Sequence, residues 1–276
     1  MKKKISGKTV LKKRIFGVDF SGAKDAGKKI WISEGVNRNG CLDIENCLRA
    51  RTLPYSDTER NRCLGALYDL VVEMKDCAFG FDFPFGLPRQ MISANSWLDF
   101  VRVFPENYRN ALEFREKCQK YNGSELKRLT DRECKTPFSP FNLRVYKQTY
   151  YGIHEILSPL VRNNLASVLP MQEAQPDKPW IFEICPASTL KKLMNLKKLP
   201  MYKGITEKHH AEREKILKYL EGLGVMVKNM TMRSEILDDE GGDALDSVIA
   251  VYATFQALNA ELELKNEYMQ EGYVFA

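Results

Sequence analysis

The first part of the chain alternates short apolar runs with polar joints. Residues 14–20, 29–36 and 41–48 are rich in β-branched and aromatic side chains, which favours three strands. The joints contain Asp25-Ala-Gly27 and Asn37-Arg-Asn-Gly40, which are typical of tight turns. The pattern therefore predicts an antiparallel meander of three strands.

After the meander the apolar residues follow a helical spacing or form longer continuous runs. Residues 57–74 carry apolar side chains at helical spacing, which predicts a helix. Residues 77–83 and 179–184 form near-continuous apolar runs, typical of strands that are covered on both faces. Further helices are expected from residue 186 onward, at 206–223 and at 243–258, and short strands at 225–228 and 271–276.

Residues 89–178 interrupt this alternation. They have helical patterns at about 95–104, 105–119 and 149–168, with a Pro- and Asn-rich loop at 136–142. We interpret this segment as a helical and loop insertion within a single domain that spans residues 1–276.

The order of the elements predicts the fold class. Three antiparallel strands come first, then a helix, then parallel strands reached through helices, and finally a long helix. This is the order of a ribonuclease H-like fold, so we predict an α/β mixed sheet of that type, flanked by helices and carrying the insertion. In such a sheet the first and fourth strands are neighbours about 4.8 Å apart, which would place Asp19 beside Asp82.

Acidic residues stand at four places where the predicted elements are otherwise apolar. Asp19 and Asp82 lie at or near strand ends, Glu183 lies in a strand, and Asp243 and Asp246 share one face of a helix. A carboxylate in such surroundings is costly unless it is paired, hydrogen-bonded or bound to a metal.

Carboxylate oxygens suit Mg²⁺ or Mn²⁺, and two such ions about 4 Å apart can drive phosphodiester cleavage. We predict Asp19, Asp82, Asp243 and Asp246 as metal ligands, and Asp19, Asp82, Glu183 and Asp243 as catalytic residues.

Each of these residues also has a structural alternative. Asp82 could cap the turn at Pro84, and Glu183 could form a buried ion pair with an arginine such as Arg144. Asp243 could be a helix N-cap, but Asp246, one turn further in, is harder to explain in that way.

The charge distribution points to an anionic partner. The net charge is +6, yet residues 231–276 carry −8, which leaves +14 on the remainder. Basic and aromatic residues interleave in the insertion, an arrangement that can track phosphates and stack bases. We predict that nucleic acid, DNA or RNA, contacts Arg132, Lys135, Arg144 and Lys147, and also Ser21 at the end of the first strand. The alternative is that Phe138, Phe141, Tyr146 and Tyr150 belong to the core and the charges form a solvated rim.

Other features narrow the class of protein. Seven cysteines without a CxxC pair favour reduced thiols over a disulfide framework or a zinc site. The basic segment Met1–Lys8 is not followed by an apolar stretch, so no signal peptide is expected. The longest uncharged apolar run, residues 247–260, is too short to span a bilayer. These features predict a cytoplasmic protein without a membrane partner.

Several segments together resemble one family. They are Gly17–Ala23, Phe81–Pro88, Ser139–Gly152, Glu183–Pro186, Tyr202–Gly204 with Arg213 downstream, and Gly242–Val248. In their order and spacing they resemble the family called domain of unknown function 429, a predicted nuclease group of the ribonuclease H-like superfamily. The resemblance implies that fold and metal-dependent phosphodiester hydrolysis.

In one respect the sequence departs from ordinary ribonuclease H. There a glutamate on the first helix completes the site, whereas here neither Glu59 nor Glu73 matches a motif, and Glu183 would have to fill that role.

Two further functions remain open beside a nuclease. An ATP-binding protein of the sugar-kinase-like or actin-like type also begins with a Gly-x-Asp strand end, but 276 residues without a repeat argue against it. A non-catalytic nucleic-acid-binding module could retain the fold and the carboxylates.

Overall fold

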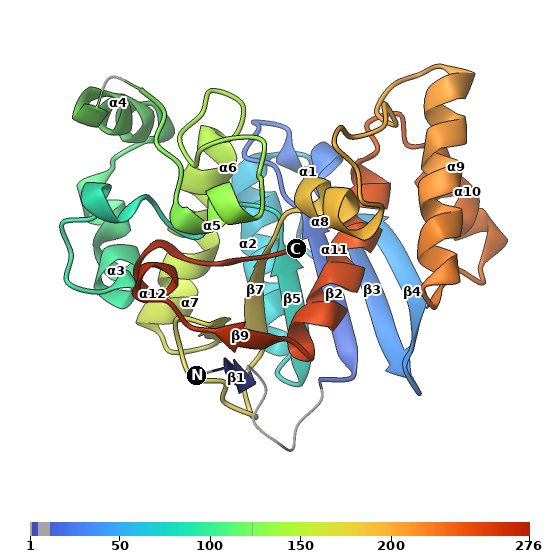
Figure 1. Ribbon diagram of the computed structural model, residues 1–276, viewed down its shortest axis with the longest axis horizontal. Coiled ribbons are helices and arrows are strands. Elements are labelled where there is room, and N and C mark those ends of the chain that lie inside the picture. The colour runs from blue at the N-terminus through green and yellow to red at the C-terminus, as the bar shows by residue number, and fades with distance from the viewer. Residues whose placement is uncertain (1, 5–11, 123) are drawn as a thin grey trace.

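The computed structural model describes residues 2–4, 12–122 and 124–276. Within these residues the chain forms an eight-stranded mixed sheet flanked by helices (Figure 1). Its strands are β2 (Arg14–Asp19), β3 (Trp31–Arg38), β4 (Cys41–Arg49), β5 (Cys77–Phe81), β6 (Ser167–Leu169), β7 (Trp180–Ile184), β8 (Val225–Met226) and β10 (Val274–Phe275).

The strand order is β10-β7-β5-β2-β3-β4-β8, with β6 paired to β7 beside this path. The strands β2, β3 and β4 are antiparallel, whereas β2–β5, β5–β7 and β7–β10 pair in parallel. A sheet of antiparallel and then parallel strands is therefore confirmed, and the first and fourth predicted strands are neighbours.

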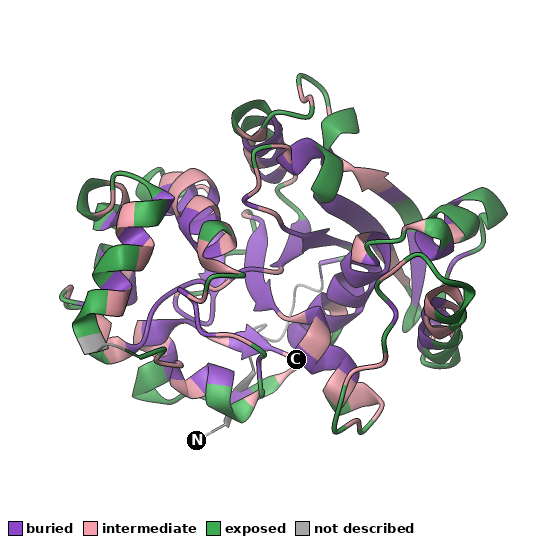
Figure 2. Cartoon of the chain, turned by 90° about the horizontal axis from the view of Figure 1, so that it is seen from above, coloured by how far each residue is buried: buried purple, intermediate pink, exposed green. Residues whose placement is uncertain are grey.

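Helices cover both faces of the sheet, with a hydrophobic core on each side. On one face α11 (Asp243–Leu258) crosses β2, β3 and β5. The helices α8 (Pro186–Leu193), α9 (Glu207–Gly222) and α10 (Met230–Asp238) share its core. On the other face α2 (Arg60–Glu73) packs against the sheet. Seen from above, the strands and α11 are largely buried and the outer helices expose their outward sides (Figure 2).

The insertion is mostly helical and packs into the same core as α2. It lies to one side of the sheet in Figure 1, where α3 to α7 gather. Its elements are η2 (Arg89–Met91), α3 (Trp97–Asn107), α4 (Ala111–Asn122), α5 (Leu129–Glu133), α6 (Tyr146–Tyr151), the π-helix η3 (Gly152–Leu157), α7 (Ser158–Arg162) and strand β6.

The predicted boundaries are wrong at several places. The joint at Asp25-Ala-Gly27 is not a tight turn but leads into the short helix α1 (Ala26–Lys29), so that the second strand begins at Trp31. The helix predicted at 149–168 ends at Arg162, because Asn164 adopts a left-handed conformation and the chain continues into β6. Pro105 lies inside α3 instead of starting a new helix.

The sequence pattern did not predict several smaller elements. These are η1 (Ala50–Thr52), α5, α10, α12 (Asn266–Glu271) and a separate antiparallel pair, β1 (Lys2–Lys4) with β9 (Glu261–Glu263). Much of the N-terminal segment used to argue against a signal peptide lies outside the described residues. None of the helices that the structure describes is long and apolar enough to cross a membrane.

Candidate active site

Two aspartates meet where the neighbouring strands β2 and β5 end. Asp19 is the last residue of β2, and Asp82 follows β5 directly. The parallel pairing matches Val18 with Phe81, and the Asp82 amide donates to the Val18 carbonyl at 3.0 Å. Within the described residues the Asp82 carboxylate accepts no hydrogen bond, so it does not cap the turn at Pro84. The sheet thus brings Asp19 and Asp82 side by side, as predicted.

Two glycines allow α11 to lie directly on these strands. Gly17 and Gly80 are register partners on β2 and β5. A Cβ on Gly17 would lie 2.2 Å from the Ser247 carbonyl oxygen, and one on Gly80 would lie 1.9 Å from Thr254 Oγ1. Such separations are far below contact distance, so the missing side chains are what permit this close approach.

The start of α11 brings the next two carboxylates to the strand ends. Oxygens of Asp19, Asp243 and Asp246 lie within 4.8 Å of one another. Asp243 does not cap its own helix, because the Asp239 carboxylate accepts the amides of Asp243 and Ala244 at 2.7 and 3.1 Å. Three of the four predicted metal ligands therefore converge, and Asp82 lies beside them.

Burial and mutual repulsion make these carboxylates hard to ionise together. Burial, followed by the charge of Asp243, raises the pKa of Asp19 well above its ordinary value. Burial, followed by the charge of Asp246, raises the pKa of Asp82 to about 8. Burial also raises the pKa of Asp246, although Lys203 opposes this. A bound cation would relieve both effects.

Lys203 is part of this cluster, and sequence reasoning gave it no role. Its Nζ lies 2.7 Å from Asp246 Oδ2 and 3.1 Å from Asp243 Oδ1. Burial acts against its charge, but attraction to Asp246 and Asp19 raises the pKa of Lys203. The neighbouring Tyr202 hydroxyl donates to Asp246 Oδ1 at 2.7 Å.

The loop that carries Lys203 is held by a buried arginine. Arg213 donates to the carbonyls of Tyr202 and Gly204 at 2.7 and 3.0 Å, and to the Leu237 carbonyl at 2.6 Å. The only sequence signal for this arrangement was the segment Tyr202–Gly204 with Arg213 downstream, which was part of the family resemblance.

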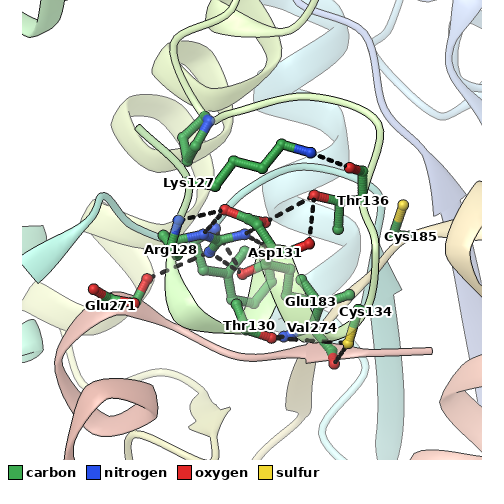
Figure 3. Close-up of polar contacts among 12 residues, drawn as sticks. Lys127, Arg128, Thr130, Asp131, Cys134, Thr136, Glu183, Cys185, Glu271 and Val274 are labelled. Carbon is green, nitrogen blue, oxygen red and sulfur yellow. Dashed lines mark hydrogen bonds and ion pairs between the residues drawn. The ribbon is translucent and has the colours of Figure 1, made fainter. Parts of the chain in front are cut away.

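Glu183 does not join the carboxylate cluster. Its register partner is Phe81, one residue before Asp82, and successive side chains of a strand point to opposite faces. Arg128 instead donates to Glu183 Oε2 at 2.8 Å (Figure 3). The Phe85 amide donates to the same oxygen at 2.9 Å. The buried ion pair considered for Glu183 is therefore present, but its partner is Arg128 and not Arg144.

Arg128 connects several parts of the chain at this point. It also pairs with Asp131, whose Oδ1 it contacts at 2.8 Å, and it donates to the Glu271 carbonyl at 3.3 Å (Figure 3). All three charged side chains are nearly inaccessible, with 1% exposure for Arg128 and 2% for Asp131 and Glu183. The cluster joins the start of α5, β7 and the last residue of α12.

A cavity of about 560 Å³ adjoins the carboxylates. Asp82, Asp246 and Lys203 line one part of it, and the Arg128 cluster lines another. Other lining residues come from the insertion, from the turn after β5, from the start of α8, from the loop before Lys203 and from β10; they include Phe83, Phe138, Arg144, Val145, Gln148, Cys185, Ala187, Leu199, Pro200, Met201 and Val274.

Some of the predicted substrate-binding residues lie at the site and others do not. Arg144 lines the cavity, and its guanidinium lies 5.4 Å from the centre of the Phe138 ring. Lys147 adjoins the strand end, because a Cβ on Gly22 would lie 2.4 Å from the Lys147 carbonyl oxygen. Neither Arg132 nor Lys135 lines the cavity, although both are exposed.

Ser21 and the aromatic residues can be placed as well. Ser21 Oγ accepts a hydrogen bond from the Ala23 amide at 3.3 Å, so it shapes the turn after β2. Phe141 and Tyr150 are buried in the core, as the structural alternative supposed, whereas Phe138 and Tyr146 are half-buried. All seven cysteines are free.

A comparison with family models gives a match over most of the chain. The family described as a protein of unknown function, DUF429, matches residues 17–263. The chain belongs to this family. No curated protein and no solved structure matches it.

The donor set of this DUF429 chain fits a hard divalent cation. Every candidate ligand is a carboxylate oxygen, the type that Mg²⁺ and Mn²⁺ prefer. Four carboxylates lie near the ammonium of Lys203, and burial together with mutual repulsion raises the pKa of Asp19 and of Asp82 despite its charge. The matched span contains all of these residues.

Proposed function

We propose that the protein is a metal-dependent nuclease with a ribonuclease H-like core, which hydrolyses phosphodiester bonds. The observation that carries the proposal is the convergence of Asp19, Asp243 and Asp246 beside Asp82. The strand order supports the core, because three antiparallel strands continue into parallel strands with β2 and β5 side by side.

The carboxylates of Asp19, Asp243 and Asp246 would hold Mg²⁺ or Mn²⁺. Asp82 lies close enough that, besides burial, the charges of Asp246 and Asp243 raise its pKa. When bound, the metal would activate water and offset charge on the phosphate. Because burial raises the pKa of Asp82 to about 8, its carboxyl keeps a proton at neutral pH when no metal is bound, so it is suited to donate a proton to the leaving oxygen. Arg144 lines the cavity and can hold a phosphate oxygen by charge-assisted hydrogen bonds.

Glu183 acts in this proposal as a positioning residue. Its hydrogen bond from the Phe85 amide fixes the turn that follows Asp82, and Arg128 holds the carboxylate in place. The orientation of Asp82 therefore depends on the buried cluster behind it.

The test is metal-induced stabilisation combined with cleavage. Mn²⁺ at about 100 times its dissociation constant should stabilise the wild type by about 2.7 kcal/mol, and oligonucleotides should be cut only with metal present. Asp19→Asn should fold but lose both effects, while the exposed control Asp69→Asn should keep both. Equal thermal shifts in wild type and Asp19→Asn would show that the carboxylates are not the metal site.

The same experiment separates the alternatives. A non-catalytic binding module would bind oligonucleotides equally well in chelator and would not cut them. An ATP-binding phosphotransferase would be stabilised by Mg²⁺ with ATP and not by an oligonucleotide.

A further inference from the structure

The cavity beside the carboxylates has the dimensions of a small-molecule site. Its volume of about 560 Å³ falls within the range of about 300–1,000 Å³ that is usual for ligand pockets. One nucleotide fits such a space, whereas a base-paired segment, which presents two stacked strands, does not.

The cavity lining combines apolar surface with seven charged side chains. Phe138 and Val145 come from the insertion, and Leu199, Pro200 and Met201 come from the loop between α8 and α9. Met201 is 65% exposed, so this wall leaves an apolar side chain open to solvent. Methionine adapts its shape to different partners, which suits a site for a flat apolar group.

Phe138 and Arg144 form a ready platform for a base. The ring is half-buried and lines the cavity, and the guanidinium lies 5.4 Å from the ring centre. Unpaired bases are commonly bound by stacking on aromatic rings and on arginine planes. Asp82, Asp246 and Lys203 line the same cavity, so one ligand in it can contact both this platform and the carboxylates.

We propose that this cavity binds one unpaired nucleotide, with its base on Phe138 and its phosphate toward Asp82 and Asp246. The ligand is a nucleoside phosphate unit, either within a single strand or free. The claim that this nucleotide is part of the substrate rests on the proposed function. Its binding to the cavity can be measured without any cleavage. Duplexes are then poor ligands unless they expose an unpaired residue.

The test compares matched ligands on the full chain, with Mg²⁺ and with oligonucleotide backbones that resist cleavage. The ligands are a nucleoside monophosphate, ribose 5-phosphate, a single-stranded oligonucleotide and the duplex of the same sequence. The nucleotide should bind more tightly than ribose 5-phosphate, and the single strand more tightly than the duplex.

Phe138→Ala isolates the stacking contact. Base–aromatic stacking contributes about 1–3 kcal/mol, so this variant should bind the nucleotide and the single strand about 5- to 150-fold more weakly. It should bind ribose 5-phosphate as the wild type does, because that ligand has no base. Tyr121→Ala, which removes an exposed ring outside the cavity, is the matched control and should change nothing. Phe138→Leu keeps apolar volume, so a loss shared by both Phe138 variants while their melting temperatures stay normal is a binding effect.

The outcomes separate the two proposals. A single strand that binds much more tightly than the mononucleotide identifies a polymer as the source, and equal affinities identify a free nucleotide. Equal binding of duplex and single strand, or of nucleotide and ribose 5-phosphate, overturns the inference, even if metal-dependent cleavage is found. Binding that depends on Phe138 without any cleavage overturns the nuclease and leaves the base site intact.

Discussion

Lys203 places an ammonium group among carboxylates that are proposed to bind a divalent ion. Its Nζ contacts both Asp243 and Asp246, so the lysine and the metal would compete for the same two carboxylates. The side chain is 48% exposed, which allows it to move aside without a large loss of packing. We therefore expect the lysine to stabilise the metal-free state and to weaken metal binding.

Lys203→Met should bind Mn²⁺ more tightly than the wild type. Two unit charges about 4 Å apart interact by about 1 kcal/mol in water and about 4 kcal/mol near a protein surface. Removing the ammonium should therefore raise the affinity for Mn²⁺ at least about fivefold. The metal-free variant should melt at a lower temperature, because its carboxylates lose their counter-ion. Calorimetric titration measures the first effect and thermal unfolding the second. Lys198→Met, at an exposed position, is the control, and looser Mn²⁺ binding in Lys203→Met would contradict this account.

Asp82 makes the stability of the metal-free protein depend on pH. Its pKa rises from 3.8 to about 8 on folding, so between these values the folded state keeps a proton that the unfolded state has lost. The stability that this retained proton gives the folded state is complete below about pH 4 and is lost as the pH rises through about 8. The free energy of unfolding then falls by at most about 1.4 kcal/mol per pH unit. Urea unfolding at several pH values should show this fall in the wild type and a shallower one in Asp82→Asn. Saturating Mg²⁺ should also flatten it, and a profile unchanged in Asp82→Asn would count against a raised pKa at this residue.

At the scale of elements, the contact between α11 and the sheet sets the geometry of the site. Gly17 and Gly80 lie next to each other under the helix, and the helix start carries Asp243 and Asp246 to the strand ends. The atoms that a Cβ on Gly17 would meet are backbone atoms of α11, including Val251 N at 2.3 Å. Backbone cannot turn aside as a side chain can, so the helix itself would have to shift.

Gly17→Ala should therefore damage both stability and metal binding. Overpacking typically costs about 1–3 kcal/mol, and the displaced helix should weaken the Mn²⁺-induced shift. Gly65→Ala is the matched control, because Gly65 lies in α2 with no atom within 4 Å of an added Cβ. Alanine at a helix interior should stabilise the protein by about 0.5–1 kcal/mol. Denaturant unfolding measures both, and full metal binding in Gly17→Ala would show that the helix position is not critical.

The sequence reveals the carboxylates that stand at the ends of regular elements. Asp19, Asp82, Asp243 and Asp246 could be placed because strand order and helical spacing determine where they lie. Glu183 could not, because its face depends on the register between β5 and β7, and a slip of one residue reverses the face. Lys203 lies in a loop without periodicity, whose path is fixed by hydrogen bonds from Arg213.

At the scale of the whole molecule, the Arg128 cluster fastens the insertion to the sheet. Arg128 and Asp131 belong to the insertion, Glu183 to β7, and Glu271 to the end of α12, shortly before β10. Since these charges are buried, removing one partner leaves the others uncompensated. The insertion and the sheet are therefore expected to unfold together.

Arg128→Met should lower the free energy of unfolding by about 3–5 kcal/mol, in a single transition. Arg162→Met, which breaks an exposed ion pair with Glu106, should cost only about 0–1 kcal/mol. Glu183→Gln should lose stability yet keep the Mn²⁺-induced shift, because this carboxylate belongs to the buried cluster. Urea unfolding followed by Mn²⁺ titration checks all three variants. If Glu183→Gln abolished the shift, Glu183 would have to be a metal ligand after all.

The separation of the carboxylates along the chain has a consequence for biosynthesis. Asp19 and Asp82 leave the ribosome before Asp243 and Asp246, which lie about 160 residues further along the chain. Until residue 246 has been translated and α11 has docked, the nascent polypeptide presents only half of the acidic set. Any activity that needs the complete set is therefore silent until this point of translation, while messenger RNA and the growing chain are held close together.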